Sequence, residues 1–115
     1  MIRLVLAIAA VATAATFAAL RMPERAQDVD GKAIYLKQCR TCHGVMGEPS
    51  TLNRDKYPKI QSFVDPKFFA KVSDDSLVAV LKKGVGKDMK SFEGKLTAQE
   101  MLAVAKYART LAVAK

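Results

Sequence analysis

The chain has 115 residues, 50% of them hydrophobic, and it carries 19 Lys and Arg against 11 Asp and Glu, a formal net charge of +8. That length supports one small domain with a modest core and excludes a larger multidomain enzyme. The basic excess is compatible with three kinds of partner: nucleic acid, an anionic membrane surface or an acidic protein.

The first segment of the chain is expected to direct export. Residues 4–20 contain no charge and are bounded by Arg3 and Arg21, and a charged start followed by a long apolar stretch is typical of a signal peptide. Small residues offer cleavage sites at residues 12–14 and 16–18. The apolar run of 17 residues also reaches the lower limit for a membrane-spanning helix, so an uncleaved anchor stays open. Its Ala and Thr content favours cleavage.

This pattern predicts three parts. Residues 1–21 are a signal peptide or membrane anchor, residues 22–29 a linker, and residues 30–115 the functional domain. Without Arg3 and Arg21 the chain keeps 17 basic against 11 acidic residues, a net charge of +6. The domain is expected in the periplasm, outside the cytoplasm, which excludes nucleic acid as its partner and exposes any free thiols to oxidation.

The domain is expected to open with a helix. Asp30 is a suitable cap, and the helix would run from Gly31 into residues 39–43, with Ile34 and Tyr35 pointing inward. Coarse periodicity predicts further helices joined by long loops, and no convincing strand alternation is visible.

All the cysteine and histidine of the chain lies in one motif, Cys39-Arg40-Thr41-Cys42-His43. C-x-x-C-H is typical of covalent attachment of a c-type haem, because each thiol can add to a vinyl group of the porphyrin and the imidazole can bind the iron. Such a cysteine pair has three alternative uses: a redox disulfide, a structural disulfide and a zinc site. A redox pair would need a βαβ context and a structural zinc site four ligands, which the sequence does not offer. The motif therefore favours haem c.

Between His43 and Asp65 the chain is rich in Gly, Pro, Ser and Asn. Such a loop is too long for a simple connector, and we expect it to wrap around something. Asp65 and Pro66 then begin a short helix that continues through Val72, since Asp suits the cap and Pro the first helical position. The apolar residues of this helix are Phe68, Phe69 and Val72.

Two more helices complete the domain. Ser73 or Asp74 caps the first of them, and Gly84 is a typical C-terminal stop. Its apolar stripe consists of Leu77, Val78, Val80 and Leu81. The last helix begins at a capping box formed by Thr97 and Glu100. Its apolar residues are Met101, Val104, Ala105, Ala108 and Leu111.

Gly31, Tyr35, Cys39, Cys42 and His43 follow the spacing Gly, three residues, aromatic, three residues, C-x-x-C-H, and Tyr107 supplies an aromatic in the last helix. In these features the chain resembles the class I (monohaem) cytochromes c of bacteria and mitochondria, over about residues 31–111. The resemblance implies an all-α fold of about four short helices and long loops wrapped around one covalent haem. It also implies that the terminal helices cross at Gly31, because glycine permits close backbone approach.

The resemblance further implies a set of site residues. The residues that bind the cofactor are Cys39 and Cys42, and the iron ligands are His43 and Met89. A loop methionine late in the chain is the family's sixth ligand, whereas Met46 is close to His43 in sequence and Met101 lies on the apolar stripe of the last helix. Many bacterial relatives have proline after this methionine. Here Lys90 follows it, which should weaken the rigidity of the loop.

In the family a proline carbonyl holds the second nitrogen of the imidazole. Pro58, in Pro58-Lys59-Ile60, is the preferred match, and Pro49 with Leu52 is the alternative. Tyr57 and Tyr35 could donate hydrogen bonds to a propionate, but we favour half-buried aromatics for both.

With His43 and Met89 both bound, no iron position remains for a substrate, so the expected function is non-enzymatic one-electron transfer by a monomer. Exposed basic residues would form a collar for acidic redox partners, although a lysine surface with no particular partner is an equal alternative. The residues of this collar are Lys37, Arg40, Lys82, Lys83, Lys87, Lys90 and Lys95. Two rival functions stay open. One is a haem subunit of a specific periplasmic oxidoreductase complex, and the other is a peroxidase or gas-binding protein if Met89 is labile.

Overall fold

The computed structural model describes Ala12 and residues 29–112. The predicted export segment, apart from Ala12, and the predicted linker, apart from Val29, lie outside the described residues. None of the helices in the described part has both the length and the apolar character needed to cross a bilayer.

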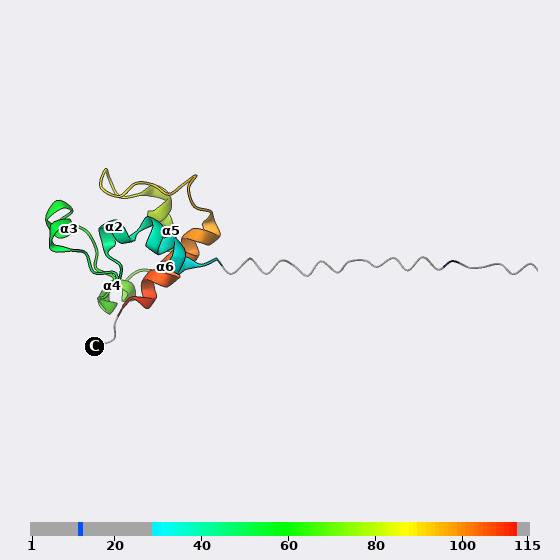
Figure 1. Cartoon of the computed structure of the whole chain (residues 1–115), viewed down its shortest axis with the longest axis horizontal. Coiled ribbons are helices and arrows are strands. Elements are labelled where there is room, and N and C mark those ends of the chain that lie inside the picture. Colours follow the sequence, from blue (N-terminus) through cyan, green and yellow to red (C-terminus); the bar gives the residue numbers. More distant parts are fainter. Residues whose placement is uncertain (1–11, 13–28, 113–115) are drawn as a thin grey trace, which may run out of the picture.

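Six helices form the described domain (Figure 1), and they are α1 (Gly31–Gln38), α2 (Arg40–His43), α3 (Thr51–Lys56), α4 (Pro66–Ala70), α5 (Asp74–Lys83) and α6 (Ala98–Thr110). The only extended pairing among these residues is an isolated antiparallel bridge between Val85 and Met89. The all-α prediction is confirmed, with more helices than the four expected.

The predicted first helix is present but bends at Cys39. Asp30 caps it as expected, because its carboxylate accepts a hydrogen bond from the Ala33 amide at 3.0 Å. At Cys39 φ is −115°, which is wider than helical values and separates α1 from α2. The motif therefore spans the end of one helix and the whole of the next, up to Gly44 at φ +82°.

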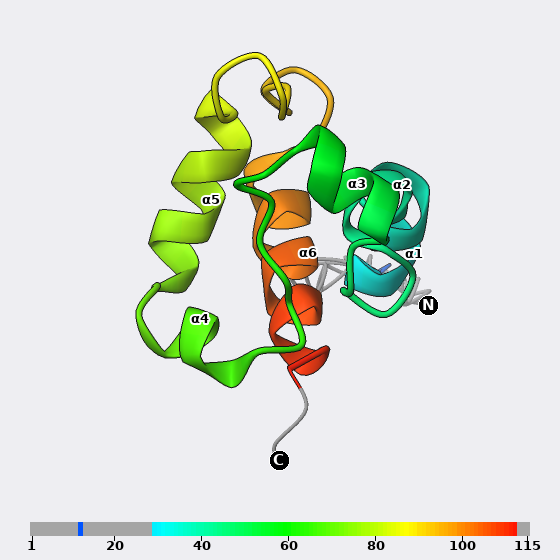
Figure 2. The same cartoon turned by 90° about the vertical axis from the view of Figure 1, so that its left-hand side faces the viewer.

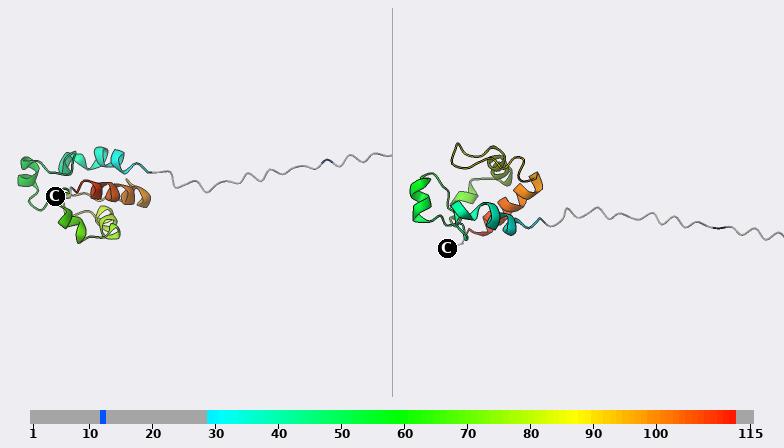
Figure 3. Two further views of the ribbon diagram at one scale, coloured as in Figure 1. Left: turned by 90° about the horizontal axis from the view of Figure 1, so that it is seen from below. Right: turned by 45° about the horizontal axis from the view of Figure 1, so that its top comes forward.

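Helix α6 lies between α5 on one side and α1 with α2 on the other, as Figures 2 and 3 show. The contact with α1 depends on Gly31: a Cβ atom there would lie 2.2 Å from the carbonyl oxygen of Ala103. The rings of Tyr35 and Tyr107 meet beside it, with centroids 5.3 Å apart. The predicted helix crossing, with the glycine and both aromatics at the contact, is confirmed.

The core is built on α6. The capping box is confirmed, since the Glu100 amide donates to Thr97 Oγ1 at 3.1 Å and the Thr97 amide to Glu100 Oε1 at 3.0 Å. All five predicted apolar residues of this helix are buried: Met101, Val104, Ala105, Ala108 and Leu111. Met101, Val104 and Leu111 form one cluster with Tyr35 and Leu81. Met101, at 2% exposure, therefore belongs to the core, as expected.

The two middle helices begin where the sequence predicts. Asp65 caps α4 and Ser73 caps α5, accepting hydrogen bonds from the amides of Lys67 and Ser76 at 2.9 and 3.1 Å. Helix α4 ends at Ala70, before the predicted Val72. The prediction that Val80 belongs to the buried stripe of α5 is wrong, because its side chain is 40% exposed.

Arg109 of α6 joins the α4–α5 corner to the core. Its guanidinium donates to the carbonyl of Phe69 at 3.0 Å and to Asp74 Oδ1 at 2.5 Å.

Helix α3 lies where the sequence predicted only loop. Ser50 caps it by accepting a hydrogen bond from the Asn53 amide at 3.2 Å. The helix has six residues, and its one large apolar residue, Leu52, is 75% exposed. A short helix without an apolar stripe leaves no periodic signal in the sequence.

Candidate haem attachment site

Cys39 and Cys42 lie within one turn of each other at the junction of α1 and α2. Both are half-buried free thiols. Burial, with a smaller contribution from Cys42, raises the pKa of Cys39 to about 11. The Cys39 sulfur is therefore a neutral thiol, packed against the core cluster that contains Tyr35 and Leu81.

His43 is the last residue of α2, and its ring is held from two sides. Nδ1 lies 3.4 Å from the carbonyl oxygen of Gln61. The ring stacks on Phe63, with centroids 4.4 Å apart and an interplanar angle of 15°. Burial lowers the pKa of the imidazole, against a smaller opposing effect of the Gln61 carbonyl. A neutral ring with Nδ1 facing a carbonyl presents Nε2 as a metal ligand.

The carbonyl that faces His43 is not the predicted one. Neither Pro58 nor Pro49 supplies it. The chain makes a tight turn at Pro58, with the Ile60 amide donating to the carbonyl of Tyr57 at 2.9 Å. This turn places the Gln61 carbonyl, rather than that of Pro58, against Nδ1. The carbonyl of Pro49 instead accepts a hydrogen bond from Arg54 Nε at 3.1 Å.

Met89 lies in the loop between α5 and α6, residues 84–96, called the methionine loop below. It is half-buried and packs against the same core cluster as Cys39. Two backbone bonds with Val85, of 2.8 and 3.2 Å, close a tight turn just before it, and the Phe92 amide donates to the carbonyl of Leu81 at 2.8 Å. Ser91 Oγ also donates to the carbonyl of Lys82. The loop is thus closed on itself up to Met89 and fastened to the end of α5 just after Met89.

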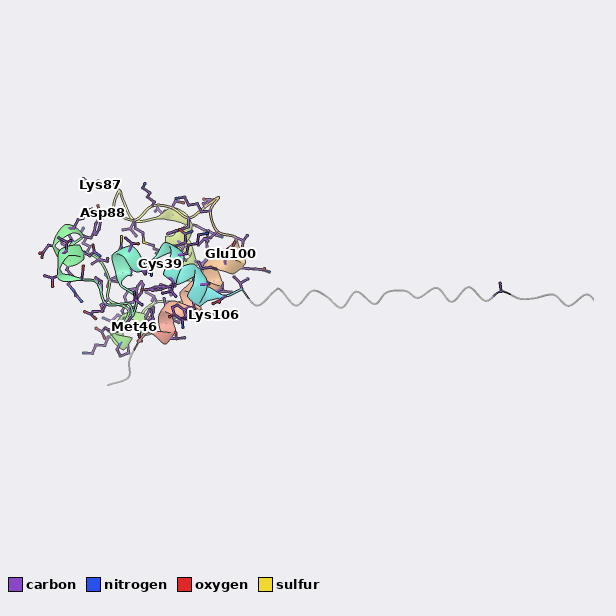
Figure 4. The ribbon with its side chains drawn as sticks, viewed as in Figure 1. Cys39, Met46, Lys87, Asp88, Glu100 and Lys106 are labelled. Carbon is purple, nitrogen blue, oxygen red and sulfur yellow. The ribbon has the colours of Figure 1, made fainter. Side chains whose placement is uncertain are left out.

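The other described methionines are placed differently. Met101 is buried in the core, and Met46 is 66% exposed. Figure 4 shows Met46 on the lower side of the domain and the methionine-loop residues Lys87 and Asp88 at its upper side, with Cys39 between them in this view. Among the described methionines, only Met89 combines partial burial with a place in a loop.

Comparison with known proteins gives a consistent result. The family model for cytochrome c oxidase, cbb3-type, subunit III matches residues 26–107. Cytochrome c6 of Microcystis aeruginosa is 35% identical over 78 residues, which cover 68% of this chain and 89% of that protein. The chain belongs to the class I c-type cytochromes.

Solved structures agree with this family. The KustC0563 c-type cytochrome superposes with a TM-score of 0.67 at 33% identity, covering 74% of this chain and all of that one. A tyrosine-to-phenylalanine variant of that protein gives a TM-score of 0.64 at 32% identity, covering 72% of this chain and 99% of that one.

This cytochrome therefore carries one covalently bound haem c, and its residues fit that group. The motif supplies two thiols for the thioether links and an imidazole held in its neutral form. Met89 has a half-buried thioether, a soft donor.

The tyrosines differ from expectation in one case. Tyr35 was expected to be half-buried, but it is fully buried, and its hydroxyl donates to the carbonyl of Gly44 at 2.7 Å. Burial, followed by the charges of Cys39 and Tyr107, raises its pKa well above the usual value. Tyr35 therefore braces the end of the motif rather than facing a propionate. Tyr57 is half-buried, as expected.

Asn53 is a site residue that sequence reasoning missed. Its side-chain amide donates to the carbonyls of Thr41 and Cys42, at 2.9 and 3.1 Å. These carbonyls lie at the end of α2, where helical partners are lacking. Asn53 thus holds α3 against the cysteine motif. Its only sequence signal was its presence in a loop rich in polar residues.

The predicted basic collar consists of exposed residues. Lys82 and Lys83 end α5, and Lys87, Lys90 and Lys95 follow in the methionine loop. Lys37 and Arg40 flank Cys39 and are also exposed.

Proposed function

We propose that this cytochrome is a one-electron carrier in which His43 and Met89 bind the iron. The haem supplies the chemistry, a change between the ferrous and ferric states. The observation that carries the proposal is the placement of Met89, which is half-buried, packed on the same cluster as Cys39 and fixed by backbone bonds. Two protein ligands leave no position for a substrate, so the proposed function is not enzymatic.

The two ligands have different roles. The desolvated ring of His43 stays neutral and keeps its tautomer through Nδ1 and the Gln61 carbonyl. The thioether of Met89 is uncharged and favours the ferrous state, which raises the reduction potential. The proposed carrier is therefore a moderate oxidant.

The test is the visible spectrum of the oxidised protein purified from its native host. A weak band at the red end of the visible range reports a sulfur–iron bond, and we expect it in the parent. Met89→Ala should abolish this band and give high-spin iron, whereas the matched control Met46→Ala should keep it. Absence of the band from the parent at neutral pH would overturn the proposal in favour of an open iron that binds peroxide or small gases.

We propose further that the protein is exported, as a periplasmic monomer. The chain is similar to a cytochrome c6, and its sequence predicts residues 1–21 as a signal peptide or anchor, 22–29 as a linker and 30–115 as the cytochrome domain. N-terminal sequencing of the native protein should find a first residue soon after residues 12–14 or 16–18. Mass spectrometry should show the added mass of one haem. An intact start at Met1 would show an anchor instead of a cleaved signal.

The proposed partners are redox proteins with acidic docking surfaces, attracted by the basic collar. Docking through exposed charges is fast, weak and sensitive to salt. Such transient contact suits a carrier that must leave after delivering its electron.

A second function is favoured by one observation. The matching family model is named for a subunit of a cbb3-type oxidase, so a haem subunit of one oxidoreductase complex is the alternative. Gentle isolation from the native host distinguishes the two. Recovery as a free monomer supports the carrier, and stable co-migration with an oxidase or dehydrogenase supports the subunit.

A further inference from the structure

Two segments on either side of α3 are tied together by Glu48 and Ser62. Ser62 Oγ donates to Glu48 Oε2 at 3.1 Å. Next to it, the Phe63 amide donates to the carbonyl of Gly47 at 2.8 Å. One side-chain bond and one backbone bond therefore join neighbouring residues of both segments.

The residues on both sides of Ser62 are those that hold His43. Gln61 presents its carbonyl to Nδ1, and Phe63 stacks on the ring. No hydrogen bond joins Ser62 to His43. Residues 61–63, called the imidazole-facing segment, therefore contact the ring at both ends and are tied to Glu48 in the middle.

The other oxygen of Glu48 connects this segment to the cysteine motif. Glu48 Oε1 pairs with Arg54 of α3, and α3 is fastened to the carbonyls of Thr41 and Cys42 through Asn53. The Glu48 and Arg54 side chains are 51% and 45% exposed, so the ion pair itself adds little stability. The ion pair matters for geometry. Through Glu48, Arg54 and Asn53, the imidazole-facing segment is connected to α2, the helix that carries His43.

We propose that Glu48 and Ser62 are positioning residues, which set the contact of the Gln61 carbonyl and the Phe63 ring with His43. This inference rests on the proposed function, in which His43 binds the iron. A carbonyl that accepts a hydrogen bond from Nδ1 makes the imidazole a more basic ligand. A more basic ligand stabilises the ferric state and lowers the reduction potential. Loss of the hydrogen bond between Ser62 and Glu48 should weaken the contact of the Gln61 carbonyl with Nδ1 of His43. The reduction potential should therefore rise.

The experiment compares the holoprotein with Ser62→Ala and Glu48→Ala. We expect the ratio of reduced to oxidised protein at a fixed poise to rise by up to about tenfold in each variant, equivalent to about 59 mV for a one-electron couple. The His43 ring protons should shift in NMR spectra, and its Nδ1 proton should exchange faster with solvent. Ser62→Thr keeps the hydroxyl and should restore the parent values.

A matched control separates positioning from general stability. Ser73→Ala removes a capping bond of similar length on α5, and it should lower the thermal midpoint without changing the potential. Because Ser62 acts through its bond to Glu48, the double variant should shift the potential no further than the larger single change.

Two failures are distinguishable. If the parent shows the sulfur–iron band but both variants keep its potential and its His43 resonances, the positioning inference is overturned. Fully additive shifts in the double variant would also contradict it. If the parent lacks the band, the proposed function has failed, and the Nδ1 exchange rate alone then decides whether Glu48 and Ser62 hold His43.

Discussion

The two proposed iron ligands are held by two different kinds of structure. His43 is fixed by side chains that reach across the chain: Glu48, Ser62 and Asn53 connect three separate segments. Met89 is fixed by backbone bonds within the methionine loop and to the end of α5. In Figure 2 the methionine loop is at the top of the domain, while the segment from α3 to α4 crosses in front of α6. The two sides should therefore respond to different kinds of substitution.

The methionine loop shows how backbone contacts replace a rigid residue. Lys90, and not a conformationally fixed proline, follows Met89, and the loop is closed by the paired amides and carbonyls of Val85 and Met89. Gly84 makes this possible, since it has φ of +75° and passes close to the returning chain. Glycine populates this backbone region without steric cost.

The largest effect is expected from Gly84→Ala. The new Cβ would lie 2.6 Å from the carbonyl oxygen of Met89 and 2.8 Å from the Ser91 amide. The loop must move, so the sulfur–iron band should weaken or vanish, and the strained backbone should cost about 1–3 kcal/mol in the free energy of unfolding. Gly94→Ala is the control, because Gly94 also has a positive φ, of +81°, with nothing within 4 Å of the added carbon. An equal loss of the band in both variants would show that backbone strain, not the contact with Met89, is responsible.

Asn53→Ala should have the next largest effect, on the histidine side only. It leaves the carbonyls of Thr41 and Cys42 without their side-chain partner, at a cost of about 1–2 kcal/mol in denaturant unfolding. The sulfur–iron band should remain, because Met89 is held elsewhere. Asn53→Asp preserves size but removes both donors, so it should be at least as destabilising. A stable Asp variant would contradict the role assigned to the amide.

Ser91→Ala tests the methionine loop more gently. It removes the hydrogen bond to the Lys82 carbonyl, at a cost of about 1 kcal/mol. Exogenous imidazole should then displace Met89 more readily, with a lower dissociation constant in a spectral titration. Ser76→Ala, which removes a hydroxyl from the exposed face of α5, is the control. Identical imidazole affinities in all three proteins would show that Ser91 does not restrain Met89.

Most of the fold could be predicted because its signals are local. Asp65, Ser73 and Thr97 each accept a hydrogen bond within the first turn of the helix they begin, and such caps are visible in sequence. The short helix α3 has a cap at Ser50 but no buried stripe, so nothing distinguished it from loop. The crossing at Gly31 was predictable only through the family spacing.

The parts of the candidate site that depend on distinctive side chains could be predicted from the sequence. The parts that depend on backbone groups could not. Cysteine, histidine and methionine carry distinctive donors, and these residues are rare in the chain. Every residue has a carbonyl, so the one that faces His43 depends on the turn at Pro58 and on the tie at Ser62, which are tertiary features. The roles of Glu48 and Asn53 were missed for the same reason, since each depends on partners in another segment.

The double change Lys87→Glu and Lys90→Glu should have the smallest effect on the fold and stability of the domain. It is also the sharpest test of the basic collar. Both side chains are exposed, and neither holds the loop, so the spectrum and stability should be unchanged. Electron transfer with an acidic partner should slow several-fold at low salt and converge with the parent rate above about 0.5 M salt, because screening removes the contribution of exposed charges. Lys106→Glu on α6 is a suitable control, because Figure 4 places Lys106 away from Lys87. Equal slowing by Lys106→Glu would show that net charge, and not the basic collar, controls the rate. Unchanged rates in the double variant would contradict docking through the methionine loop.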